Sequence, residues 1–139
     1  MQFLIGLLFV VLSCGAAEIN AEKGIAIEGF DTVAYFTDGK AVKGRAEFSH
    51  QWQGAQWRFA SEDHRKLFAA NPERYAPQYG GFCSMSMSKG NLVRTDPKAW
   101  KIVSGKLYFV HDKNTLPAFE SQAEDNIEKA NFFWPKFYK

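Results

Sequence analysis

Apolar and polar residues alternate with a period of two in two neighbouring segments, residues 47–52 and 55–60. Strand side chains point alternately to opposite faces, so each segment is predicted to be a β-strand with one apolar face. Gln53 and Gly54 lie between the segments and are typical of a tight hairpin turn. Short apolar runs bounded by turn residues predict further strands at 32–36 and 91–94, and a second hairpin at 100–103 and 106–110.

A helix is predicted to begin after Ser61, because serine is a preferred N-cap and two carboxylates follow it at the positive end of the helix. This helix should run to about Ala70, expose Asp63 and Lys66, and bury Leu67 and Phe68. A further short helical turn is expected at 73–75.

Near the C-terminus, apolar residues recur at every third or fourth position after Thr115, which predicts a helix or helix pair with one apolar stripe. The stripe consists of Leu116, Phe119, Ala123, Ile127, Ala130 and Trp134. Together these elements predict an α+β fold, with a small, mainly antiparallel sheet of two hairpins packed against interleaved and C-terminal helices.

The first 17 residues carry no charge, and residues 3–12 are apolar except for Gly6. This run is shorter than the roughly 20 residues that a membrane-spanning helix needs. Small residues follow it, so residues 1–17 are interpreted as a signal peptide cleaved near Ala17 or Ala21. A helix buried in the fold is the alternative.

Residues 11–15 also resemble a bacterial lipobox, in which a leader ending at Ser13 is removed and Cys14 is lipidated. Both interpretations predict an exported protein, either periplasmic or secreted, or else lipid-anchored at Cys14. Membrane contact is expected only through the leader or the lipid anchor.

The composition argues against a nucleic-acid partner, because the net charge is only +2 and opposite charges are interspersed along the chain. Aromatic residues make up 16% of the sequence, enough for a dense core without disulfides. The chain lacks the CxxC, HExxH, P-loop, GxGxxG-helix and GxSxG motifs. No catalytic residue is therefore assigned, and a function other than catalysis is favoured.

Cys83 would be the lone thiol of the exported domain, and Met85 and Met87 follow it at every second position. An extended backbone would place all three sulfurs on one face, which suits Cu(I). A helical backbone would keep Cys83 and Met87 on one face and turn Met85 away, so that His64 or another residue would have to complete a site. The alternative is a buried sulfur that packs in the core.

Three segments, residues 29–36, 57–68 and 71–83, together resemble the exported proteins that contain a YHS domain, and the likeness extends over residues 24–135. This resemblance implies a link with metal handling, since the YHS domain accompanies copper- and heavy-metal-transporting ATPases and some oxygenases. Phe82, Cys83 and Ser84 match the element that carries the family's cysteines. The second cysteine of the metal-linked members is absent here.

Three hypotheses follow. In the first, the domain binds a soft metal such as copper through Cys83, assisted by Met85, Met87 or His64. In the second, it is a non-catalytic interaction or structural module that recognises another exported protein, with Cys83 inside the core. In the third, Cys83 and His64 form a thiol-based redox or acyl-transfer pair. Asp31 is expected to be a turn-forming carboxylate that accepts backbone N–H groups.

Overall fold

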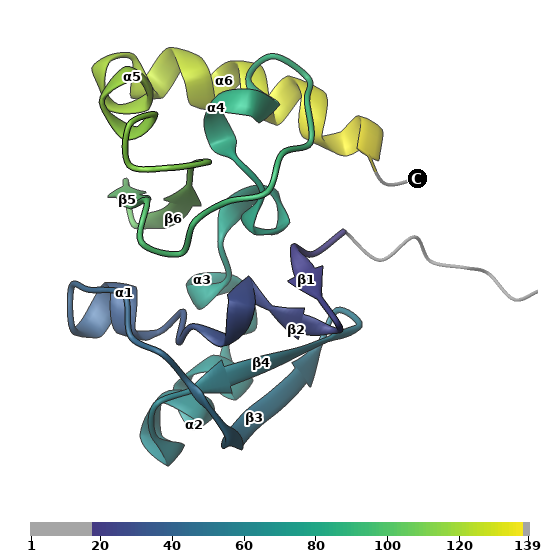
Figure 1. The fold of residues 1–139 in the computed structure, drawn as a ribbon, viewed down its shortest axis with the longest axis vertical. Helices are drawn as coiled ribbons and strands as arrows, with labels where there is room; N and C mark the ends of the chain where they lie inside the picture. The colour runs from purple at the N-terminus through teal and green to yellow at the C-terminus, as the bar shows by residue number, and fades with distance from the viewer. Residues whose placement is uncertain (1–17, 138–139) are drawn as a thin grey trace, which may run out of the picture.

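The computed structural model describes residues 18–137. The predicted leader, its cleavage position at Ala17 and the lipidation candidate Cys14 lie outside the described residues. Figure 1 shows two parts joined near α3: strands β1 to β4 lie in the lower part, and the β5–β6 hairpin with α4, α5 and α6 lies in the upper part. None of the helices in residues 18–137 is both long and apolar enough to cross a bilayer.

The lower part contains a four-stranded sheet in the order β1–β2–β4–β3. Its strands are β1 (Ala21–Glu22), β2 (Ile25–Ala26), β3 (Arg45–Trp52) and β4 (Ala55–Phe59). Strand β2 runs parallel to β4, and the other pairs are antiparallel. The helical elements of this part are η1 (Ile27–Gly29), α1 (Ala34–Thr37), α2 (Glu62–Ala70) and α3 (Pro72–Tyr75).

The upper part is built on the antiparallel hairpin of β5 (Trp100–Val103) and β6 (Lys106–Phe109). Its helical elements are η2 (Gln78–Gly81), α4 (Ser84–Met87), α5 (Leu116–Ser121), α6 (Ala123–Phe133) and η3 (Trp134–Phe137). The α+β class is therefore confirmed, with the two predicted hairpins in separate sheets. The predicted C-terminal stripe corresponds to the pair α5 and α6, where Phe119 and Ala130 are fully buried.

Both hairpins turn through two residues with positive φ, namely Gln53 and Gly54 in the first and Ser104 and Gly105 in the second. Turns of this kind match the right-handed twist of the flanking strands. Local sequence thus determines both connections, which is why the pattern of alternating residues located them.

The predicted strand at 32–36 is wrong, because residues 32 and 33 form a turn that leads into the short helix α1. The reason is the side chain of Asp31: its Oδ1 accepts the N–H groups of Val33 at 2.9 Å and Ala34 at 3.1 Å. A carboxylate in this position caps a helical turn, and the cap outweighs the strand preference of Thr32 and Val33.

The predicted strand at 91–94 is also wrong, since this segment has no strand assignment. The chain at Cys83 occupies the position beside β6 where a third strand would pair. Cys83 forms an isolated parallel bridge with Phe109 of β6, and its N–H donates to Val93 O at 2.8 Å. Leu67, predicted to be buried, is 42% exposed, whereas Phe68 of the same helix is fully buried.

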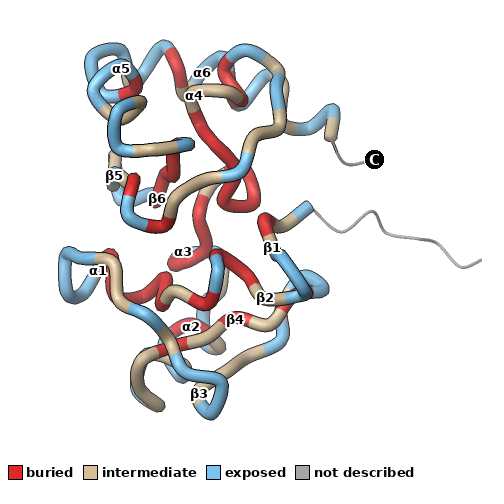
Figure 2. Tube along the Cα trace, in the orientation of Figure 1, coloured by how far each residue is buried: buried red, intermediate tan, exposed pale blue. Residues whose placement is uncertain are grey.

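A buried run of residues from 75 to 84 links the two parts, and Figure 2 shows it as an almost continuous red segment between α3 and α4. Gly80 and Gly81 make its path possible. Both have positive φ, and a Cβ on Gly80 would collide with the backbone of Glu18, while one on Gly81 would collide with Ile27. Glycine alone fits this close approach.

Two clusters of buried residues fill the interior. The first surrounds Trp57, Phe59 and Phe68 and reaches Phe109 of β6. The second contains Cys83 and Met87 together with Tyr79, Ala99, Tyr108, Val110, Phe119 and Ala130. Tyr35 joins the two parts, because its ring packs edge-on against Trp100 and Phe109 and its hydroxyl donates to Pro97 O at 2.7 Å.

Candidate functional site

Asp31 lies between η1 and α1, and its carboxylate is completely buried. Besides capping α1 through Oδ1, it accepts two hydrogen bonds at Oδ2: from the backbone N–H of Ala60 at 2.9 Å and from Nδ1 of His64 at 2.6 Å. Both oxygens are therefore fully engaged. The predicted role of Asp31 as an acceptor of backbone N–H groups is confirmed, and the partner His64 is an addition to it.

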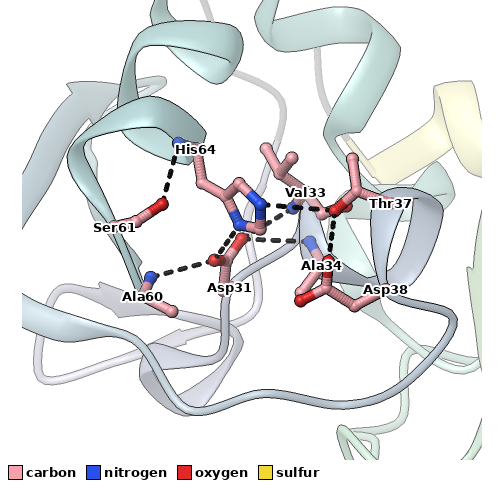
Figure 3. A network of polar contacts seen from close by, with 8 residues as sticks. All are labelled: Asp31, Val33, Ala34, Thr37, Asp38, Ala60, Ser61 and His64. Atoms are coloured by element: carbon pink, nitrogen blue, oxygen red, sulfur yellow. Dashed lines mark hydrogen bonds and ion pairs between the residues drawn. The ribbon is translucent and has the colours of Figure 1, made fainter.

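His64 occupies the first turn of α2, where its backbone N–H donates to Ser61 Oγ at 3.2 Å. This bond confirms Ser61 as the N-cap. The imidazole is only 17% exposed, and it extends between Asp31 and the hydroxyl of Thr37, with Nε2 lying 3.3 Å from Thr37 Oγ1 (Figure 3). Because a carboxylate only accepts, Nδ1 carries the proton that it shares with Asp31.

The chain of Asp31, His64 and Thr37 has the order of groups found in nucleophile triads. Its geometry serves structure instead. The hydroxyl of Thr37 lies closer to a better acceptor, Asp38 Oδ1 at 2.9 Å, than to the imidazole. A buried carboxylate needs hydrogen bonds, and here the donors come from the start of α1, from Ala60 after β4, and from α2. The hydrogen bonds of Asp31 thus connect α1, the end of β4 and α2.

The charge of Asp31 also acts on the neighbouring Tyr35. Burial is the main cause that raises the pKa of the Tyr35 hydroxyl, and the negative charge of Asp31 raises this pKa further. The hydroxyl therefore stays protonated and keeps donating to Pro97 O. The hydroxyl of Thr32, the residue after Asp31, is buried in the same region and has no hydrogen-bond partner.

Cys83 lies at the N-cap of α4 and is fully buried. Its Sγ accepts the N–H of Ser86 at 3.4 Å, the sulfur counterpart of a serine cap. The hydroxyl of Ser84, the next residue, is buried and has no hydrogen-bond partner. The thiol is thus a free cysteine within the second cluster, with one polar contact of its own.

The residues after Cys83 are helical, so the helical alternative describes this segment. Met87 is fully buried in the same cluster as Cys83, whereas Met85 is half-buried at its margin. The backbone therefore separates the three sulfurs into a buried pair and a peripheral thioether. His64, the fourth predicted ligand, hydrogen-bonds to Asp31 and Thr37 in the other part of the molecule.

The predicted metal ligands are thus distributed over two regions. Cys83 and Met87 belong to one cluster, Met85 packs beside it, and His64 belongs to the Asp31 network. Within residues 18–137, the side chains of His, Cys, Asp and Glu form no group of three or more that could hold a metal ion. The predicted ligand set remains a prediction, and Cys83 with Met87 is the part of it that the fold brings together.

Comparison with protein families gives one match. The family model described as YHS domain matches residues 33–79, and the resemblance to this domain is confirmed for that segment. The match includes α1, the first hairpin, α2 and α3, and it ends at Tyr79, before Cys83. No curated protein and no solved structure matches the chain significantly.

The pairing of Asp31 with His64 could not be found from the sequence, because the two residues are 33 positions apart and no spacing motif joins them. The available signals were local. Asp31 follows a glycine and an aromatic residue in a turn-like context, and His64 is in the first turn of a well-capped helix. Only the tertiary fold, in which α2 packs on β3 and β4, brings the two side chains into contact.

Proposed function

We propose that this chain is a non-catalytic interaction or structural module of an exported protein, in which Cys83 serves the core. The observation that carries the proposal is the complete burial of Cys83 at the N-cap of α4, with its sulfur accepting a backbone N–H. Reactive thiols need access to solvent and an environment that favours the thiolate. A buried thiol among aromatic and aliphatic side chains packs as a small apolar group.

The experiment is native-state labelling of Cys83 with an aromatic disulfide reagent, in a chain whose other cysteine, Cys14, is replaced by serine. The matched control is a Cys83→Ala, Ser104→Cys protein, which moves the thiol to the exposed turn between β5 and β6. Cys83 is expected to react at least about a hundredfold more slowly than the thiol at position 104, because it reacts only after local or global opening. Equal labelling rates would refute the proposal.

Binding of a soft metal is the second candidate, and the placement of Cys83 and Met87 favours it. Both are fully buried in one cluster, one turn of helix apart, and thiolate and thioether sulfurs are ligands that Cu(I) prefers. The YHS-domain match is consistent with metal binding, although the matched segment ends before Cys83. Such a site would use two sulfurs, with Met85 and His64 outside it.

Anaerobic titration with Cu(I) against a chromogenic competitor distinguishes the two candidates. A metal site predicts one tight equivalent that is lost in Cys83→Ser, weakened in Met87→Leu and retained in Met85→Leu. The core-residue proposal predicts the same weak uptake by all four proteins. Met85→Leu is the matched control, because it removes a sulfur of the same kind at the margin of the cluster.

A further inference from the structure

An open cavity of about 340 Å³ lies between the β5–β6 hairpin and α6, and it is called the hairpin cavity. Its volume falls within the range of small-molecule sites, about 300–1,000 Å³. Neither Asp31 nor Cys83 lines it, so the proposed function does not use it. Apolar, polar and charged side chains share its walls, and their arrangement follows from the pairing of the two strands and the period of the helix.

The strand wall of the hairpin cavity follows from the register of β5 and β6. In that register Val103 lies opposite Lys106, and two positions along, Lys101 lies opposite Tyr108. Residues directly opposite each other in an antiparallel pair share one face of the sheet. Lys101 forms an ion pair with Glu120 of α5 at 3.8 Å. The other three side chains of this face line the cavity.

The helix wall of the hairpin cavity is one face of α6, formed by residues three or four positions apart. These residues are Glu124, Ile127, Glu128 and Asn131. Ile127 is half-buried and packs on the second cluster. Asn131 is held by Tyr79, whose hydroxyl donates to Asn131 Oδ1 at 2.8 Å. The amide N–H groups of Asn131 have no partner within residues 18–137 and remain available as donors.

The two walls carry charges of opposite sign that do not pair with each other. Within residues 18–137, Lys106 on the strand wall and Glu124 and Glu128 on the helix wall form no ion pair. The next charges on α6, Asp125 and Lys129, pair with each other at 2.9 Å. The helix dipole favours Glu124, which lies in the first turn. It does not account for Glu128, and like charges one turn apart repel, so a bound cation would stabilise the helix wall.

Tyr108 supplies an independent observation that points to a ligand. It is only 4% exposed, and its ring packs between Tyr79 and Phe119 with centroids at 6.0 and 5.8 Å. Its hydroxyl makes no hydrogen bond within residues 18–137, yet it is not enclosed as the unpaired hydroxyls of Thr32 and Ser84 are. The hydroxyl therefore opens on the cavity that Tyr108 lines. Burial raises the pKa of the Tyr108 hydroxyl, so it stays protonated and can donate to an anionic group.

We propose that the hairpin cavity binds a small zwitterion with an apolar side chain, either a free amino acid or a dipeptide. The carboxylate of the ligand lies between Lys106 and the hydroxyl of Tyr108, and its ammonium contacts Glu128. Its side chain packs on Val103 and Ile127. A ligand with a single charge would leave the charge on one wall unpaired. The site is separate from the buried thiol and does not depend on the function proposed for it.

The first test is isothermal titration calorimetry of the full chain with leucine, leucylleucine, isopentylamine and isocaproate. The last two are leucine without its carboxylate and without its ammonium. At least one zwitterion is expected to bind about tenfold or more tightly than either single-charge analogue, since each analogue lacks a charge-assisted hydrogen bond. Tighter binding of leucine or of leucylleucine identifies the source as a free amino acid or a peptide. If neither zwitterion binds, or an analogue binds as tightly, the proposal is overturned.

The second test uses variants in matched pairs. Tyr108→Phe keeps the ring and should weaken zwitterion binding about tenfold. Its control is Tyr75→Phe, since Tyr75 is 7% exposed and its hydroxyl also lacks a partner within residues 18–137, but it does not line the cavity. The exposed Glu128→Gln should weaken binding to a similar extent, whereas Asp125→Asn, which removes a paired carboxylate of the same helix, should not. Urea midpoints verify folding, and equal affinities within each pair overturn the proposal.

Discussion

Asp31 and Cys83 are both fully buried, but their surroundings differ in the number of hydrogen bonds that each side chain makes. The carboxylate of Asp31 has four donors, three from the backbone and one from His64. The thiol of Cys83 has a single weak contact from a backbone N–H and is otherwise surrounded by the second cluster. A buried charge must be paired, whereas a buried thiol packs as a hydrophobe. Chemical reactivity of a residue type therefore does not identify the site on which the fold depends most.

The largest effect is expected from Asp31→Ala. The substitution leaves the N–H groups of Val33, Ala34 and Ala60 without their acceptor and removes the hydrogen-bond partner of His64 Nδ1. We expect a loss of about 3–5 kcal/mol in the free energy of unfolding, measured by urea denaturation. Asp38→Ala is the control, since Asp38 is an exposed carboxylate of the same network, and it should cost less than about 1 kcal/mol. Similar losses in both variants would contradict a special role for Asp31.

Cys83→Ala tests how much the buried thiol contributes to stability. It removes one buried sulfur and leaves a small cavity, so the unfolding free energy should fall by about 1–2 kcal/mol, less than for Asp31→Ala. The α-helical circular dichroism and the cooperativity of unfolding should be unchanged. If Cys83→Ala proved more costly than Asp31→Ala, the thiol would have to hold more of the structure than its contacts indicate.

Ser61→Ala tests the cap of α2 without touching either buried group. The Oγ of Ser61 accepts the backbone N–H of His64, and its loss should cost about 1 kcal/mol in urea denaturation. Ser61→Asp restores an acceptor at the positive end of the helix and should recover most of that loss. A cost well above that of Cys83→Ala would mean that the cap, through His64, supports the Asp31 network as well.

The smallest effect concerns Asp112, an accessible carboxylate that precedes α5. Its side chain accepts hydrogen bonds from the hydroxyl and the backbone N–H of Thr115, and these bonds hold the pKa of this carboxyl below its usual value. A group with a lowered pKa stabilises the fold at neutral pH and loses that contribution as the pH falls through its folded-state pKa. The urea midpoint of Asp112→Asn should therefore be lower than that of the unchanged protein at pH 7, and this difference should shrink toward pH 3.

Local signals were sufficient for several elements. The two hairpins, the Ser61 cap and the C-terminal helix pair were all predicted, because each depends on turn residues, a cap or a periodicity within a few positions. The segment at 32–36 was predicted as a strand because its side chains favour one, and the Asp31 cap decided otherwise. The predicted burial of Leu67 is wrong. Leu67 and Phe68 are adjacent in α2 and point in different directions, and the sequence alone does not show which of the two faces the core.

Features that depend on long-range packing were not predictable. Cys83 bridges Phe109, and its N–H binds Val93, so the chain at Cys83 separates residues 91–94 from the hairpin that they would have extended. The sequence is compatible with either an extended or a helical backbone from Cys83 to Met87, and the structure has the helix α4 there. The contact between Asp31 and His64 likewise exists only in the folded chain, where α2 packs on β3 and β4.

The most direct test of Cys83 as a core residue is the rate of thiol labelling over a series of urea concentrations below the unfolding midpoint. A thiol buried in the cooperative core reacts only through unfolding, so the logarithm of its labelling rate should rise with urea along the slope that describes global unfolding. A core thiol at Cys83 is expected to give that slope, together with a free energy of opening close to the free energy of unfolding. A fast labelling rate that does not change with urea would show a thiol accessible in the native fold, and would contradict the assignment of Cys83 to the core.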